Sequence, residues 1–170
     1  MRYLCDTKQT IFTLCSMKKT IFTLALCLAV AAVTAVTAQN PLNRSAKSIL
    51  GKYLVAEPGN DSKVEITLND DGSFDCTVIW LEHPNDPKTG QPLTDTKNSD
   101  KKLRDRPIVG LKLIQGLKYN ADKQQWDGAK VYDPNRGIRA NVTIWFTDDG
   151  QLALKGSVLG ISETQYWKKL

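Results

Sequence analysis

The sequence is poor in the residues on which most enzyme sites depend. Its 170 residues include a single histidine, His83, and four cysteines. His83 stands beside Pro84 in a polar stretch, and no serine occupies the G-x-S-x-G segment typical of a nucleophile elbow. Zinc sites are built mainly from Cys and His, so the sequence does not favour a metal site. It offers no catalytic motif and indicates no cofactor.

Cysteine is scarcer still beyond the first 38 residues, where Cys76 is the only one. A domain with one thiol has no internal disulfide, so packing and hydrogen bonds must stabilise it. Cys76 lies in an alternating run and shares a face with Phe74, Val78 and Trp80. We therefore expect it to be buried as a small apolar side chain.

The N-terminal 38 residues have the three-part layout of a secretory signal peptide. Two lysines follow Met17, an apolar run reaches about Val33, and small residues stand at 36–38. The apolar run is too short for a stable transmembrane helix. We predict a signal peptide over 1–38 with its true start at Met17, and no membrane span after cleavage. The expected location is the bacterial periplasm or the exterior of the cell.

The net charge is lower when residues 1–38 are left out. Four basic residues and one acidic residue precede Gln39, so the net charge falls from +5 for the whole chain to +2 for residues 39–170. A nearly balanced surface gives no reason to expect nucleic acid as a partner.

The remaining sequence predicts β-structure. A polar lead-in over 39–48 precedes one domain over 49–170, and no long window shows the apolar period of a helix. Two Asp-Asp-Gly turns, ending at Gly72 and Gly150, each join two alternating runs, as β-hairpins do. The strands predicted from alternation cover 63–68, 74–81, 108–114, 116–119, 125–132, 141–146, 152–154 and 163–168.

Many short strands at this spacing are typical of an antiparallel sandwich or a closed barrel, and closure removes exposed sheet edges. We therefore predict an all-β antiparallel barrel or a strongly curved sandwich. Its core is expected to form from the faces that carry Tyr53, Phe74, Trp80, Ile144, Phe146 and Tyr166.

Two stretches concentrate charged, aromatic and turn residues. One runs from the end of a polar loop over 82–105 into Arg106-Pro107, and the other covers 126–137. Residues before proline adopt extended or turn geometry, which places these side chains at strand ends. We expect the following candidate ligand-binding residues to gather at one end of the barrel: Asp95, Asn98, Arg106, Trp126, Tyr132, Asp133 and Arg136.

The arginines of these stretches have two interpretations. They can form ion pairs with nearby aspartates that brace the mouth of the barrel, or they can offer forked donors to a carboxylate, phosphate or sugar hydroxyl. The residues alone leave both open.

The same stretches resemble the DUF2147 family of small exported bacterial proteins of unknown function. The resemblance rests on 106–111, 132–137 and the closing Gln165-Tyr166-Trp167, and covers nearly all of 49–168. It implies a lipocalin-like barrel and transfers no catalytic residues. We therefore expect a non-enzymatic envelope protein that binds a small molecule or envelope component in or at the mouth of the barrel. The alternatives are an interaction module with a filled barrel and, less favoured, a hydrolase of envelope saccharide or lipid.

Overall fold

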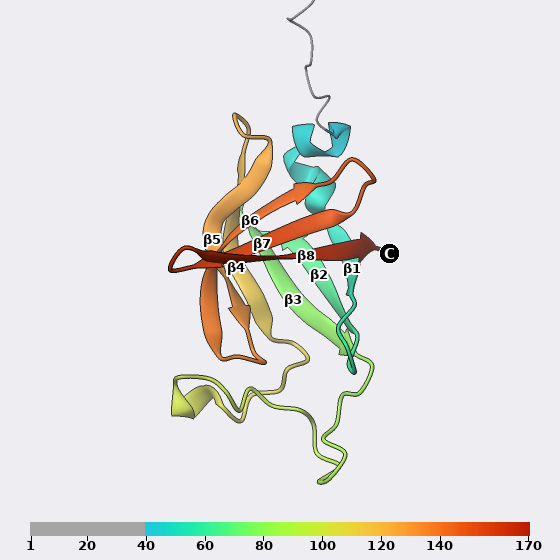
Figure 1. Ribbon diagram of the computed structural model, residues 1–170, viewed down its shortest axis with the longest axis vertical. Coiled ribbons are helices and arrows are strands. Elements are labelled where there is room, and N and C mark those ends of the chain that lie inside the picture. Colours follow the sequence, from blue (N-terminus) through green and yellow to red (C-terminus); the bar gives the residue numbers. More distant parts are fainter. Residues whose placement is uncertain (1–39) are drawn as a thin grey trace, which may run out of the picture. The chain divides into compact units, whose positions relative to one another are not determined.

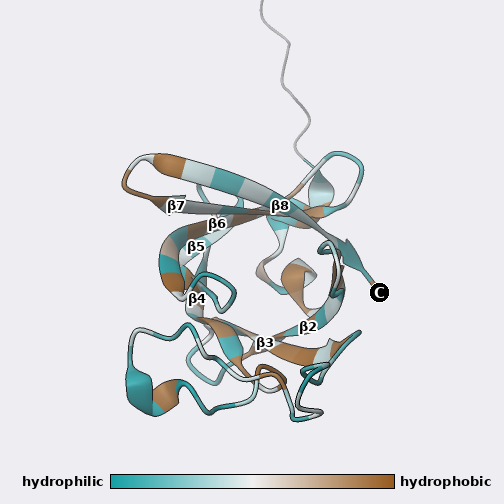
Figure 2. Ribbon diagram, turned by 60° about the horizontal axis from the view of Figure 1, so that its bottom comes forward, coloured by the Kyte–Doolittle hydropathy of each residue, from teal (hydrophilic) through white to brown (hydrophobic). Residues whose placement is uncertain are grey.

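The computed structural model describes residues 40–170, which form a closed antiparallel barrel of eight strands (Figures 1 and 2). The strands follow one another around the barrel in chain order, and β1 and β8 close it through Tyr53–Lys169 and Leu54–Lys168. The elements are η1 (Pro41–Arg44), η2 (Ala46–Ile49), β1 (Gly51–Val55), β2 (Ser62–Leu68), β3 (Phe74–Leu81), η3 (Lys101–Leu103), β4 (Lys112–Asn120), β5 (Gln125–Asp133), β6 (Ile138–Phe146), β7 (Leu152–Val158) and β8 (Ile161–Lys169).

The predicted all-β antiparallel barrel is thus confirmed, and the alternative of an open sandwich is not needed. The two runs predicted over 108–114 and 116–119 form one strand, β4, while 108–111 belong to the preceding loop. The predicted signal peptide and its start at Met17 lie outside the described residues. Within residues 40–170, no helix has the length and apolar character needed to cross a membrane.

The Asp-Asp-Gly turns make the tight β2–β3 and β6–β7 connections. Gly72 and Gly150 have φ of 80° and 82°, in the left-handed region that glycine enters without steric cost. The two turns also share a hydrogen-bond pattern, in which Gly72 N–H donates to Asn69 O and Gly150 N–H to Thr147 O. This local chemistry explains why the hairpins are readable in the sequence.

Large buried side chains fill one half of the barrel. Tyr53, Phe74, Trp126 and Phe146 are each no more than 2% exposed there, and the ring centroids of Trp126 and Phe146 lie 5.9 Å apart in an edge-on arrangement. Burial of such side chains contributes the main favourable free energy of folding.

The lead-in forms η1 and η2, which cover this filled end (Figure 1). The side-chain amide of Asn43 pairs with the backbone of Phe146, accepting from its N–H at 2.7 Å and donating to its carbonyl at 2.8 Å. Tyr53 Oη donates to Ile49 O at 2.7 Å, and Trp126 Nε1 donates to Ala46 O at 3.0 Å. The polar atoms of the buried aromatic side chains thereby find partners in the lead-in.

Two predicted core residues, Trp80 and Tyr166, lie on the outer face instead. On β3 the register against β2 shifts between Lys63 and Val64, so that Ile79 is an extra residue and Trp80 turns outward. Trp80 is 39% exposed and lies under the ammonium group of Lys63.

On β8 the predicted alternation is correct, but the face predicted to point inward points outward. Trp167 pairs with Leu152 and is buried, whereas its neighbour Tyr166 is exposed. The remaining predicted core residues are buried, and so is Cys76. Burial, with the charge of Asp75 as a smaller cause, raises the pKa of the Cys76 thiol to about 12, which keeps it unreactive at neutral pH.

Candidate functional site: a cavity at the open end of the barrel

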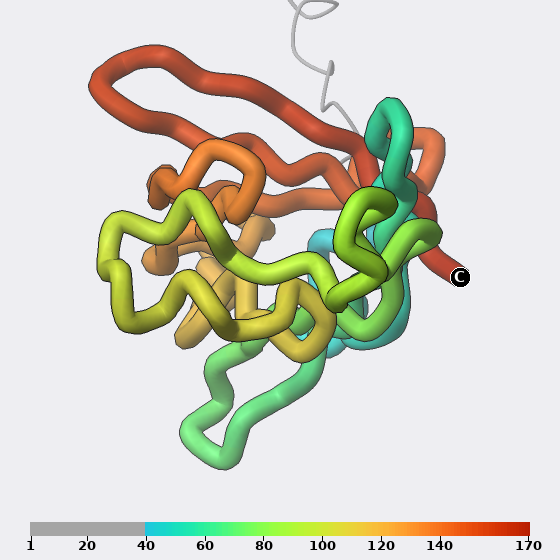
Figure 3. Tube along the Cα trace, turned by 90° about the horizontal axis from the view of Figure 1, so that it is seen from below, coloured from blue at the N-terminus to red at the C-terminus, as the bar shows by residue number. Residues whose placement is uncertain are grey.

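The end of the barrel opposite η1 and η2 holds a cavity of about 400 Å³. It opens among the turns that connect β1 to β2, β5 to β6 and β7 to β8, with the long loop 82–111 beside them (Figure 3). Apolar side chains from most of the strands and from the long loop line its interior, including Val55, Val78, Leu81, Ile108, Leu113, Val131, Leu154 and Trp167.

Small inward-facing side chains on β5, β6 and β7 contribute to the space of the cavity. Gly156 on β7 faces Ala140 on β6 and Val131 on β5, and a Cβ atom at Gly156 would lie 3.4 Å from that of Ala140. The other half carries Trp126 and Phe146 on the same two strands, β5 and β6. The change from large to small side chains along these strands leaves the open half unfilled.

Polar side chains ring the mouth and connect the three hairpins. Arg136 Nη1 lies 2.8 Å from Glu163 Oε2 on β8, and Arg136 Nε lies 3.6 Å from Asp133 Oδ2. Asn135 Nδ2 donates to Glu57 Oε2 at 3.1 Å, which joins the β5–β6 turn to the β1–β2 turn. Apolar side chains stand beside this polar ring, among them Ile138, Val158 and Ile161, all partly exposed.

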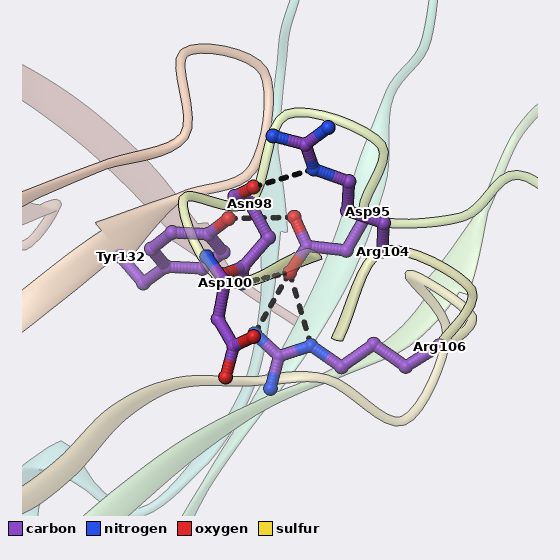
Figure 4. A network of polar contacts seen from close by, with 6 residues as sticks. All are labelled: Asp95, Asn98, Asp100, Arg104, Arg106 and Tyr132. Carbon is purple, nitrogen blue, oxygen red and sulfur yellow. Dashed lines mark hydrogen bonds and ion pairs between the residues drawn. The ribbon is translucent and has the colours of Figure 1, made fainter. Parts of the chain in front are cut away.

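A second polar cluster, the Asp95 network, fixes the long loop to the barrel (Figure 4). The Asp95 side chain is fully buried and accepts four hydrogen bonds. Tyr132 Oη donates to Oδ1 at 2.6 Å, while Asn98 Nδ2 at 2.7 Å and Arg106 Nε and Nη2 at 3.0 and 2.8 Å donate to Oδ2. Both oxygens of this carboxylate therefore have internal partners.

The protonation equilibria in this network follow from its geometry. Burial is the largest single influence on Asp95 and favours its neutral form. Hydrogen bonds from Tyr132, Asn98 and Arg106, with the charge of Arg106, together outweigh burial and lower the pKa of Asp95. Burial and the neighbouring carboxylate raise the pKa of Tyr132. At neutral pH Asp95 is therefore a carboxylate and Tyr132 a neutral phenol.

A close backbone contact holds the same loop at Gly137. Gly137 has φ of 69°, and a Cβ atom there would stand 2.0 Å from the carbonyl oxygen of Lys97. Only glycine permits the β5–β6 turn to approach the loop this closely. A cation–π contact from Arg106 of the loop to the ring of Tyr132 adds to the attachment, and Arg139 on the neighbouring strand β6 contacts the same ring.

The predicted ligand-binding residues therefore separate into three places. Asp133 and Arg136 line the cavity mouth. Asp95, Asn98, Arg106 and Tyr132 form the loop attachment, and of these only Tyr132 also borders the cavity, with its hydroxyl bonded to Asp95. For these four residues the structure favours the bracing interpretation of the ion pairs.

The prediction that Trp126 lies with the others is wrong. Trp126 is fully buried at the filled end, against Tyr119 and Phe146. It precedes Tyr132 by six residues on the extended strand β5, which separates the two by roughly 20 Å. The two residues are near each other in the sequence and lie on the same strand, but they are at opposite ends of the barrel.

Several mouth residues were missed from the sequence, namely Glu57, Asn60, Glu163 and Gln165. Glu163 and Gln165 share the inner face of β8 with Trp167, so the correct choice of inner face would have revealed them. Glu57 directly precedes Pro58, so the signal that marked Asp133 beside Pro134 is also present there, and Asn60 follows the Pro58-Gly59 turn. Within residues 40–170, no three His, Cys, Asp or Glu side chains converge as metal ligands.

Comparison with known proteins identifies the family. The family described as "Uncharacterized protein conserved in bacteria (DUF2147)" matches residues 51–169, which include all eight strands. This chain belongs to the DUF2147 family. No curated protein matches it.

A solved structure extends this result to the fold. Protein HP1028 from the human pathogen Helicobacter pylori, described as belonging to the lipocalin family, superposes with a TM-score of 0.58. The two sequences are 25% identical, and the match covers 72% of this chain and 82% of that one. The DUF2147 barrel described here is therefore lipocalin-like.

Proposed function

We propose that this DUF2147 protein is a non-enzymatic binding protein that holds one small molecule with an apolar body in the cavity of its barrel. The observation that carries the proposal is the apolar cavity of about 400 Å³ with a polar mouth. Sites for small molecules are typically concave, mostly apolar and about 300–1,000 Å³ in volume. An eight-stranded barrel is also just wide enough to enclose one such ligand.

The two alternatives receive less support. A barrel that serves only as an interaction module would need no cavity, whereas side chains fill just one half of this one. A hydrolase would need a carboxylate free to exchange a proton with its substrate. Both oxygens of Asp95 accept hydrogen bonds within the loop attachment, and Asp133 and Glu163 are paired with Arg136, so Glu57 alone remains at the cavity where such a hydrolase uses a pair of carboxylates.

A substitution that fills the cavity tests the binding proposal. Ala140→Trp places a large ring into the open half, and we expect it to weaken binding of the neutral fluorescent probe N-phenyl-1-naphthylamine at least tenfold. Lys130→Trp, on the exposed outer face of the neighbouring strand β5, is the matched control and should bind as the parent does. Fluorescence titration measures both, with circular dichroism to verify that each variant is folded. Equal affinity in all three proteins would contradict the proposal.

We further propose that the protein acts in the bacterial periplasm or outside the cell. The support is the signal-peptide pattern over 1–38. Intact mass of the protein from the envelope fraction of its own host should give an N-terminus at or next to Gln39. A mass that retains residues 17–38 would contradict export as a soluble protein.

A further inference from the structure

The mouth of the cavity carries more negative than positive charge. The charged residues that line it are the acidic Glu57, Asp133 and Glu163 and the basic Arg136. With all four ionised, three carboxylates surround a single guanidinium, which leaves two negative charges in excess at the opening.

The single cation is already engaged. Arg136 contacts Glu163 at 2.8 Å and Asp133 at 3.6 Å, and these contacts, with the hydrogen bond to Glu163 as the largest influence, raise the pKa of Arg136. An anionic group that approached Arg136 would have to displace a carboxylate, and it would then face the remaining ones. The mouth is therefore unfavourable for a fatty-acid carboxylate or a phosphate.

Glu57, in contrast to Arg136, forms no ion pair within residues 40–170. Its carboxylate is half-buried and accepts a hydrogen bond from the neutral amide of Asn135. It is thus a carboxylate at the cavity mouth with no cation of the described residues at ion-pair distance, although its charge acts on Arg136 from farther away and helps to raise the pKa of that side chain.

The carboxylates also stand next to apolar surface. Ile138, Val158 and Ile161 line the same opening, and Ile161 is 79% exposed. A ligand whose apolar body enters the cavity would cover these side chains and place its head group among Glu57, Asp133 and Glu163. Displacement of water from such a rim strengthens the attraction between opposite charges.

We infer that the cavity selects amphiphiles with a cationic, ammonium-type head group, which Glu57 contacts at the mouth and which the excess negative charge of Asp133 and Glu163 over Arg136 attracts. This inference rests on the proposed function, because it names the chemical class of the ligand for the same cavity. It follows from two observations together. The apolar cavity favours a ligand with an apolar body, and the excess of negative charge at the opening favours a cationic head group.

Three probes with the same ten-carbon chain separate the contribution of the head group from that of the chain. Decyltrimethylammonium and decyl sulfate, each below its micellar concentration, and 1-decanol, below its aqueous solubility, compete with N-phenyl-1-naphthylamine for the cavity. Partly exposed ion pairs have modest strength, so we expect the cation to bind roughly tenfold more tightly than the alcohol, and the sulfate to bind most weakly. Added salt should reduce the preference for the cation.

Variants that remove negative charge test whether the mouth causes the preference for the cation over 1-decanol. Glu57→Gln and the double variant Glu57→Gln/Glu163→Gln should lose most of the preference for the cation while binding 1-decanol as before. Glu65→Gln is the matched control, because Glu65 lies on β2 opposite Lys52 and Thr77, away from the cavity lining. It removes the same charge without touching the mouth.

The outcomes distinguish this inference from the proposed function. If 1-decanol binds but the cation binds no more tightly, the head-group inference is overturned and the cavity remains a binding site. The inference also fails if Glu65→Gln lowers the preference as much as Glu57→Gln does. If neither the fluorescent probe nor any of the three chains binds, the proposed function itself is overturned.

Discussion

Replacing Asp95 with alanine is expected to release the long loop and to lower the free energy of unfolding by about 3 kcal/mol. The substitution leaves the Arg106 guanidinium without its counter-ion and the buried hydroxyl of Tyr132 without its acceptor. Loss of one partner from a buried ion pair costs about 3–5 kcal/mol, and we expect the lower end because the Arg106 side chain is 31% exposed. For a domain of this size the melting temperature should fall by about 10 °C.

Thermal unfolding followed by circular dichroism measures this loss, and limited trypsin digestion at Lys97, Lys101 and Lys102 reports release of the loop. Asp105→Ala is the control, because Asp105 is an exposed residue of the same loop. Equal melting temperatures in the two variants would show that the Asp95 network does not hold the loop.

The same network predicts a dependence on pH. The pKa of Asp95 is lower in the folded protein than in the unfolded chain, where it is about 3.9. Its contribution to stability is therefore complete above the unfolded pKa and is lost as the pH falls through the folded pKa. Asp95→Ala should remove part of the acid sensitivity of the parent. Some must remain, because the pKa of Asp75 is lowered as well.

The barrel could be predicted because its signals are local. Alternation with period two and an Asp-Asp-Gly turn both lie within a single hairpin, and the hairpins of this fold join strands that are neighbours in the sequence. Trp80 was misplaced because the irregularity between β2 and β3 depends on the pairing of two strands, which alternation within one strand does not reveal. Tyr166 and Trp167 are both aromatic, so the composition of β8 did not indicate which face is inside.

The site was harder to predict because its residues meet only through the closure of the barrel. Asp133, which precedes Pro134, does lie at the end of β5, and Asp133 and Arg136 line the cavity mouth, whereas Arg106, which precedes Pro107, lies within the long loop. The pattern did not separate residues that fasten a loop from residues that face a cavity. That difference depends on the partner of each side chain: Asp95 finds its partners within the loop and Tyr132, whereas Glu57, which also precedes a proline, lies at the cavity mouth.

The position of Trp126 gives a second large expected effect. Trp126→Ala should lower the free energy of unfolding by about 3–5 kcal/mol, because it removes a fully buried indole that packs against Tyr119 and Phe146. It also leaves the carbonyl of Ala46 without its donor, which loosens η2 at the filled end. Since the cavity lies at the other end, the affinity for N-phenyl-1-naphthylamine should not fall at temperatures where the variant is folded.

Two further variants make this test specific. Trp126→Phe keeps an aromatic ring but removes the N–H donor, so we expect it to cost about 1–2 kcal/mol. Trp145→Ala, on the outward side of β6 where the side chain is half-buried, should cost less than Trp126→Ala. If Trp126→Ala instead abolished probe binding with little loss of stability, Trp126 would belong to the ligand site, and the division of the barrel into a filled end and a binding end would be wrong. The expected result, a large loss of stability with binding retained, would show that the two ends of one strand carry separate roles.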